Sequence, residues 1–98
     1  MPGYAIVQVN VTDETKYREY MARTPATIEQ YGGKFIVRGG ELDVVTGTPP
    51  YPRVVVLEFP TAERASEWAR SPEYAEACRY KEGAAEAVLF VVDGVAPS

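Results

Sequence analysis

The sequence predicts a single α+β domain in which helices cover one face of one antiparallel sheet. Segments with the alternating pattern of strands and segments with the three-to-four spacing of helices follow in the order strand, helix, strand, strand, helix, strand. This βαββαβ order is the split βαβ arrangement of ferredoxin-like folds. The chain has 98 residues, which is the length of one small domain. We therefore assign one domain to residues 1–98, with its core at about residues 4–95.

The first strand and the first helix are marked by clear patterns. Residues 4–11 alternate and are rich in valine, so one face carries alanine and valine and the other is half apolar, with a tyrosine, an isoleucine and two amide side chains. Residues 12–13 supply a capping side chain, and a stripe of tyrosine, methionine, threonine and isoleucine follows at helical spacing. Pro25 falls inside this stripe and predicts a kink or a division of the helix. Gly32 is expected to end the helix in the left-handed conformation.

The middle of the chain predicts a second strand that is interrupted by glycine. Residues 34–38 form the strand, Gly39 and Gly40 interrupt it, and residues 41–46 are expected to continue the extended run. Glycine within a strand pattern indicates a bulge or a close approach of another backbone. Residues 47–52 contain three prolines and predict a stiff turn.

The last third of the chain repeats the strand, helix, strand order. Residues 53–59 are apolar on both faces, which is typical of a central strand. Thr61 is the expected cap of the second helix, and Ser71 followed by proline predicts that this helix is split. Residues 87–93 form the last strand, which is again apolar on both faces.

Two strands that are apolar on both faces require cover on both faces. The chain has enough helices to cover only one face of the sheet. The other face would be a large exposed apolar patch, which soluble monomers avoid. A second copy packed sheet against sheet is the simplest cover, and twofold symmetry is the commonest arrangement. We therefore expect a homodimer that forms through the sheet faces.

The charge of the chain is small and dispersed. Lys and Arg number 10 and Asp and Glu number 14, which gives a formal net charge of −4 with no basic cluster. Because binding to a phosphate backbone needs a concentrated positive face, nucleic acid is not an expected partner. No apolar run approaches the ~20 residues that span a bilayer, and the first residues show no signal peptide. We expect no membrane association and a cytoplasmic location.

The chain contains no histidine and a single cysteine. The absence of histidine excludes histidine-based acid–base catalysis and histidine-ligated zinc or haem. One cysteine excludes an intrachain disulfide, and the acidic residues show no spacing like that of an EF-hand loop. We expect no metal site and no organic cofactor.

Three segments carry a resemblance to a known family: YGGKFIVRGG, RVVVLEFP and ARSPEY. Together they resemble the domain-of-unknown-function 1330 family of the dimeric α/β-barrel superfamily, over a match from about Tyr4 to Val95. The resemblance implies a ferredoxin-like fold and a homodimer. It implies no substrate or catalytic residue, although the wider superfamily includes small cofactor-free monooxygenases, haem degraders, isomerases and stress-response proteins.

The first candidate site combines an arginine, two glycines and a glutamate. Arg38 beside Gly39 and Gly40 has the chemistry to hold a carboxylate or phosphate against bare backbone. Counting across the turn with a bulge at the glycines places Glu58 near Arg38, where it would orient a ligand or take a proton. We therefore name Arg38 and Glu58 as candidate catalytic residues. The alternative is a strand bulge with a structural ion pair.

The second candidate site is a set of aromatic side chains that point from the helices toward the sheet. Tyr17, Tyr20, Trp68 and Tyr74 would line a pocket for a flat organic ligand, and Asn10 would serve as a hydrogen-bond partner for a phenol or a ligand. The alternative is ordinary core, because aromatic residues dominate cores.

These candidates leave two functions open. The first is a cofactor-independent enzyme or a binder of a small anionic or aromatic metabolite in a pocket between the sheet and the helices. The second is a non-catalytic interaction or stress-associated module with a filled core. An open cleft between the aromatic residues and Arg38 would favour the first, and a tightly packed space would favour the second.

Overall fold

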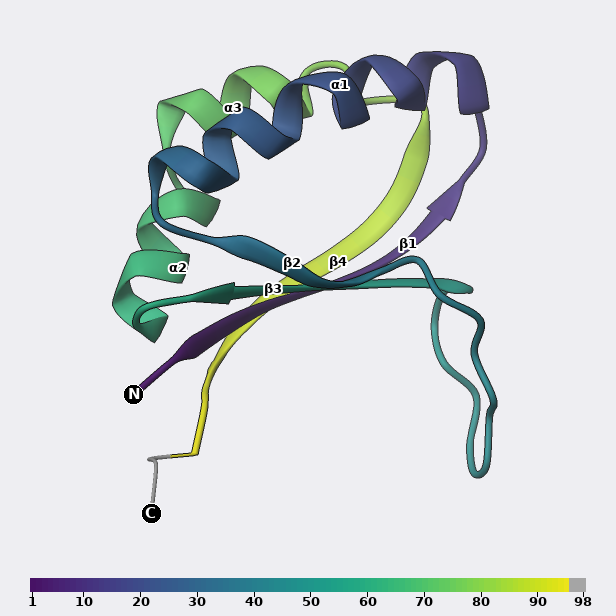
Figure 1. The fold of residues 1–98 in the computed structure, drawn as a ribbon. Helices are drawn as coiled ribbons and strands as arrows, with labels where there is room; N and C mark the ends of the chain where they lie inside the picture. The colour runs from purple at the N-terminus through teal and green to yellow at the C-terminus, as the bar shows by residue number, and fades with distance from the viewer. Residues whose placement is uncertain (96–98) are drawn as a thin grey trace.

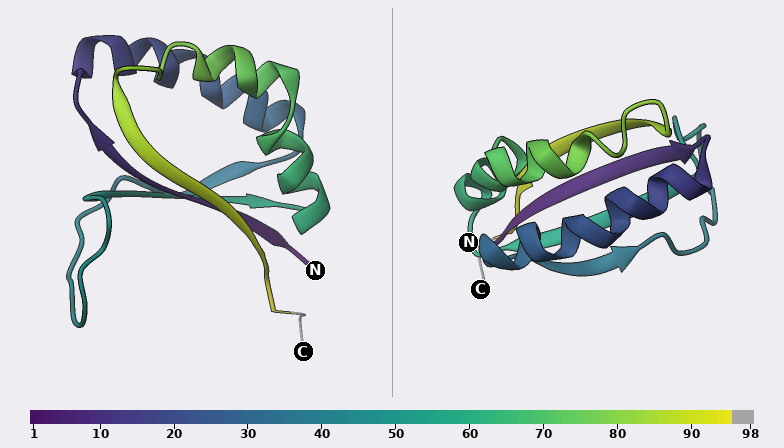
Figure 2. Two further views of the ribbon diagram at one scale, coloured as in Figure 1. Left: turned by 180° about the vertical axis from the view of Figure 1, so that it is seen from behind. Right: turned by 90° about the horizontal axis from the view of Figure 1, so that it is seen from above.

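The computed structural model describes residues 1–95 and shows the predicted order of elements (Figure 1). These elements are β1 (Gly3–Val11), α1 (Glu14–Gln30), β2 (Lys34–Arg38), β3 (Arg53–Phe59), α2 (Ala62–Ala69), α3 (Pro72–Cys78) and β4 (Ala85–Asp93). The strands form one antiparallel sheet in the order β2-β3-β1-β4. All three helices lie on one face of this sheet (Figure 2). The α+β, ferredoxin-like fold is thereby confirmed.

The core lies between the sheet and the helices. Ala5, Val7 and Val9 alternate along β1 and are 0–7% exposed, as the pattern of the first strand predicts. Trp68 of α2 fills the centre of the layer, with its ring centroid 5.5 Å from that of Phe59. Burying a large apolar side chain stabilises a fold by roughly 1.5–3 kcal/mol. This layer therefore supplies most of the apolar stabilisation of the subunit.

All three helices begin at a capping side chain: Thr61 and Ser71 are the caps that the sequence predicted, and the cap of α1 is Asp13, the second residue of the predicted helix start at residues 12–13. Asp13, Thr61 and Ser71 each accept a hydrogen bond from the backbone N–H three residues later, at 3.1 Å in every case. Each cap satisfies one of the N–H groups that a helix start leaves without a partner. The caps therefore fix where α1, α2 and α3 begin.

Helix α1 continues through Pro25, so the predicted division of this helix is wrong. The buried stripe extends on both sides of the proline, with Tyr20 at 6% and Ile28 at 2% exposure. Since most helical stability in proteins comes from packing of the apolar face, this contact outweighs the one hydrogen bond that proline removes. The helix ends where predicted, because Gly32 adopts a φ of 80°.

The connection between β2 and β3 differs from the prediction in two ways. The extended run over residues 41–46 is not a strand, and residues 40–52 instead form a projecting loop. The bulge lies between Phe35 and Val37 rather than at the glycines. After this bulge Arg38 pairs with Val55, and both side chains face the helices.

The sheet face away from the helices, called the open face below, carries an apolar row across all four strands. Val37, Val56, Ile6 and Phe90 occupy successive paired positions from β2 to β4. Val37 and Phe90 are 41% and 45% exposed in the single chain. The predicted imbalance between apolar sheet surface and helical cover is therefore present in the structure.

Candidate functional site

A cleft of about 250 Å³ lies between α1 and the β2–β3 half of the sheet. Most of its lining is aliphatic or aromatic, and two arginines lie among these apolar residues. The residues on which its chemistry depends are Tyr17, Tyr20, Phe35, Arg38, Arg53 and Trp68. Concave, mainly apolar sites with a few converging polar groups are typical of small-molecule binding.

The positive charge of the cleft comes from Arg38 and Arg53. The Arg38 guanidinium lies 4.1 Å from the centre of the Phe35 ring, and that of Arg53 lies 5.8 Å from the Tyr17 ring. Neither arginine forms an ion pair with any acid among residues 1–95. Because arginine stays charged and presents a planar set of donors, the pair is available to an anionic group.

Gly39 lies directly against the side chain of Arg53. Gly39 has a φ of +73°, and its backbone N–H donates to the carbonyl of Val54 at 2.8 Å. A Cβ at this position would lie 3.4 Å from Cγ of Arg53. Only glycine adopts this backbone conformation without strain. Gly39 therefore lets the aliphatic stem of Arg53 pack against the backbone at the end of β2.

The tyrosines of the cleft are neutral hydrogen-bonding groups at physiological pH. Burial raises the pKa of Tyr17, against an opposing effect of the nearby Arg53. Burial also raises the pKa of Tyr20, whose hydroxyl lies 2.8 Å from that of Tyr74. Burial likewise raises the pKa of Tyr74, which lies behind the lining. These phenols keep their protons, so they are suited to donate hydrogen bonds rather than to act as bases.

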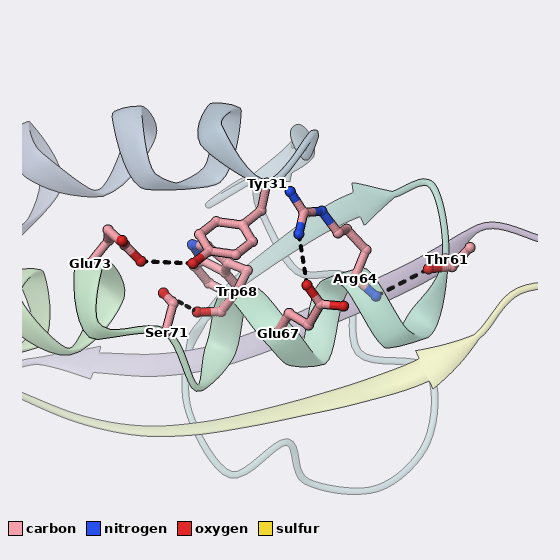
Figure 3. A network of polar contacts seen from close by, with 7 residues as sticks. All are labelled: Tyr31, Thr61, Arg64, Glu67, Trp68, Ser71 and Glu73. Carbon is pink, nitrogen blue, oxygen red and sulfur yellow. Dashed lines mark hydrogen bonds and ion pairs between the residues drawn. The ribbon is translucent and has the colours of Figure 1, made fainter.

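Trp68 forms the inner end of the cleft and is held on several sides. Its indole N–H donates to Oγ1 of Thr27 at 3.0 Å, and its ring centroid lies 4.2 Å from that of Tyr74. Its carbonyl accepts a hydrogen bond from Oγ of Ser71 at 2.7 Å (Figure 3). An aromatic group whose orientation is fixed in this way offers a rigid contact to a ligand.

A polar network outside the cleft joins α1 to the other two helices (Figure 3). The Tyr31 hydroxyl donates to Glu73 at 2.7 Å, and this bond lowers the pKa of the Glu73 carboxyl. Arg64 lies 4.6 Å from the centre of the Tyr31 ring and pairs with Glu67 at 2.7 Å. The contacts are largely exposed and add little stability. They connect the residue that follows α1 to α2 and α3 at the surface.

The prediction that Glu58 lies beside Arg38 is wrong. Glu58 pairs in register with Lys34, its Oε1 lies 3.4 Å from Nζ of Lys34, and it accepts a hydrogen bond from Tyr4 at 3.3 Å. It is on the open face, whereas Arg38 faces the helices. The physical reason is the register: Arg38 pairs with Val55, three residues from Glu58 along β3, and the bulge before Val37 turns Arg38 to the opposite face.

The other predicted site residues divide between the cleft and its surroundings. Tyr17, Gly39 and Trp68 line the cleft with Arg38, as expected. Asn10 does not, because it pairs with Glu86 on the open face, and it is therefore no partner for the buried phenols. Gly40 and Tyr74 lie outside the lining, in the following loop and behind Tyr20 respectively.

Two important residues of the cleft were missed from the sequence. Arg53 is the first residue of β3, and its alternation with Val55 and Leu57 indicates the helix face. Phe35 follows from the same alternation, because it pairs with Leu57. The signal was present in both cases, but without the register neither residue stands out from an ordinary strand.

The lining also limits the chemistry. No carboxylate, cysteine or histidine lines this cleft. Among residues 1–95, no three or more His, Cys, Asp or Glu side chains gather as they would around a metal ion. In the same part of the chain, no helix combines the length and the apolar character that crossing a membrane requires. The cleft is thus equipped for binding through arginine, phenol and aromatic contacts.

Known structures share this fold. A protein of unknown function from Rhodopseudomonas palustris, RPA0582, matches with a TM-score of 0.74 and 21% identity, over 98% of this chain and 84% of that one. A dimeric ferredoxin-like protein of unknown function from Jannaschia sp. CCS1 matches with a TM-score of 0.72 and 14% identity, over 96% and 100%. SnoaB, a cofactor-independent oxygenase from Streptomyces nogalater, matches with a TM-score of 0.62 and 9% identity, over 98% of this chain and 95% of that one. At these identities the likeness shows the fold alone.

The sequence comparison gives the family. No curated protein matches the chain. Residues 2–95 match the family described as Domain of unknown function (DUF1330), which spans all the elements and every residue of the cleft. The resemblance drawn from three short segments is therefore confirmed over nearly the whole sequence. This chain belongs to the DUF1330 family.

Proposed function

We propose that the cleft binds a small planar anion. The observation that carries the proposal is the pair Arg38 and Arg53, which have no acidic partner among residues 1–95 and line an otherwise mainly apolar cleft. A ring would lie beside Tyr17 and Phe35, above the buried Trp68, and its carboxylate or phosphate would face the guanidinium groups. Charge-assisted hydrogen bonds of this kind are about twice as strong as neutral ones.

The size of the cleft favours a ligand with a single ring. Its volume of about 250 Å³ is just below the range of roughly 300–1,000 Å³ that drug-sized ligands occupy. The neutral phenol of Tyr17 adds a donor for a carbonyl or hydroxyl oxygen. The proposed ligand class is therefore a one-ring aromatic or carbonyl compound with one anionic group.

Binding is better supported than proton abstraction. The predicted base, Glu58, lies on the open face, and the lining offers no other carboxylate. SnoaB is a cofactor-independent oxygenase with this fold, but the residues described here supply positioning rather than a base. The alternative of an interaction module with a filled core is less well supported, because the space between α1 and the sheet is open.

The same proposal includes a homodimer formed through the open face. The single chain exposes 6139 Å², compared with about 5,500 Å² expected for a folded monomer of this size. A second copy would cover the apolar row. The Jannaschia protein of the same fold is described as dimeric.

Calorimetric titration tests the ligand proposal. Benzoate and phenyl phosphate represent the proposed class, and benzamide is the uncharged control. We expect Arg38→Gln and Arg53→Gln each to weaken anion binding by about 10- to 100-fold, since a hydrogen bond to a charged group contributes roughly 1.5–3 kcal/mol. Arg70→Gln changes an exposed arginine outside the cleft and should leave binding unchanged, as should Glu58→Gln.

Any of three results would overturn the ligand proposal. One is binding of benzamide as tightly as benzoate, since the arginines would then contribute nothing. Another is an unchanged affinity in both cleft variants. Failure of every one-ring anion to bind would reject the ligand class as well.

A further inference from the structure

The loop between β2 and β3, residues 40–52, is called the arm below. It leaves the sheet on the side opposite the helices and projects past the open face (Figure 1, Figure 2). Residues 40–50 are all exposed. Leu42, Val44 and Val45 are among them, with 41%, 50% and 89% of their surface exposed. Three apolar side chains on one projecting loop are an unusual cost for a monomer.

The backbone of the arm also lacks partners. The last ladder bond before it runs from the N–H of Gly39 to the carbonyl of Val54. Among residues 1–95, no backbone hydrogen bond to or from residues 40–52 is present. The segment ELDVVT has the valine and threonine content of a strand. A backbone segment that favours strand formation, has no pairing partner and lies beside exposed apolar side chains is a template for pairing with another chain.

We propose that the arm of each subunit clasps a second copy of this chain that is docked on the open face. Leu42, Val44 and Val45 then pack against the partner subunit, and the free N–H and C=O groups of the arm find partners there. This inference rests on the homodimer included in the proposed function.

Two observations favour a second copy over another partner. The arm lies on the same side of the sheet as the apolar row of the open face, so one docked molecule contacts both. The exposed surface exceeds that of a monomer of this size by a few hundred Å², and a subunit in a standard interface buries about 800 Å². A twofold axis supplies two arms and two open faces at once.

The clasp also acts on the cleft. The arm begins directly after Gly39 and ends directly before Arg53, so both of its ends join residues of the lining. A contact that fixes the arm therefore also fixes the arginine pair. Arginines that are already ordered in the dimer lose less conformational entropy when the ligand binds. We expect the isolated subunit to bind the anion more weakly than the dimer.

The first test places charge in the apolar part of the arm. The double variant Val44→Asp/Val45→Asp is compared with Thr48→Asp, which adds charge to the same arm at a polar position. Sedimentation equilibrium should show that the dimer of the double variant dissociates at least about tenfold more readily, because burying a carboxylate without a partner is costly. The control should match the parent protein. Equal dimer dissociation constants for the double variant and the parent would overturn the proposal.

The second test needs no substitution. Hydrogen exchange of the parent protein is followed at concentrations above and below the dimer dissociation constant. Arm amides have no partner within the described subunit, so protection at residues 41–46 that grows with concentration supports the clasp. Exchange at the free-peptide rate in a fully dimeric sample would refute it, as would a protein that stays monomeric. A clasp refuted in this way leaves the ligand proposal standing, because the arginines of the cleft are tested separately by calorimetry.

Discussion

Replacing Thr27 by valine should destabilise the protein by removing one buried acceptor. Oγ1 of Thr27 accepts the hydrogen bond that the Trp68 indole donates, at 3.0 Å, and donates to the carbonyl of Thr24 at 2.7 Å. Valine has a similar shape and fills the same space, so packing changes little. The carbonyl of Thr24 retains its ordinary helical partner. The unpaired indole N–H is therefore the main consequence.

The expected magnitude follows from the burial of Trp68. This side chain is 1% exposed, so water does not replace the lost acceptor. Leaving a buried donor unsatisfied costs about 1–3 kcal/mol. For a domain of 60–100 residues, each kcal/mol lowers Tm by roughly 4–8 °C. We expect a fall in Tm of at least about 4 °C at a fixed protein concentration, which must be held constant if the protein dimerises.

Thr24→Val is the matched control, because it makes the same change on the same buried stripe. The hydroxyl of Thr24 donates to the carbonyl of Tyr20 at 2.8 Å, and that carbonyl already accepts within the helix. Its removal leaves no buried group unpaired. Urea melts followed by the fluorescence of the single tryptophan measure both variants. If the two valine variants lose the same stability, the indole bond is not the cause and the reasoning fails.

Two further predictions concern pH and backbone packing. Burial raises the pKa of Tyr17 and Tyr20 above the value of 10.0 that a free phenol shows. The stability that these neutral phenols contribute is therefore complete below about pH 10, and the free energy of unfolding should fall as pH rises above that value. Urea melts paired with tyrosinate absorbance measure this fall. A urea midpoint that does not change above about pH 10 would contradict the prediction. Gly3→Ala should cost about 1–3 kcal/mol, because a Cβ would lie 2.2 Å from the backbone of Ala62, whereas Gly40→Ala, with nothing within 4 Å, should be neutral or slightly stabilising. Thermal melts that rank the two alanine variants in the opposite order would refute this reading.

Local chemistry made most of the fold predictable. Caps at Asp13, Thr61 and Ser71, a left-handed Gly32 and alternating strands each depend on a few neighbouring residues. Such signals are short in range and can be read along the chain. The division at Pro25 was mistaken because the loss of one hydrogen bond is local, whereas the packing of α1 on the sheet that offsets it is not.

The arm shows the limit of strand propensity. The composition of residues 41–46 is that of a strand, yet within the described residues 1–95 no strand pairs with this segment. A strand needs a partner as well as a suitable sequence. If a second molecule supplies the pairing strand, residues 41–46 would be extended in the dimer and a loop in the single chain. Hydrogen exchange of the arm tests this.

The position of one bulge decides the chemistry of the cleft. In an unbroken ladder from the pair Lys34 and Glu58, Arg38 would lie opposite Val54 and share the open face with Glu58. The extra residue between Phe35 and Val37 moves Arg38 opposite Val55 instead, and so turns its guanidinium toward the helices. The same shift places Arg38 and Glu58 on opposite faces of the sheet. A cation without an acid partner in an aromatic cleft is thus a product of register, and register depends on strand pairing rather than on the residues of either strand alone.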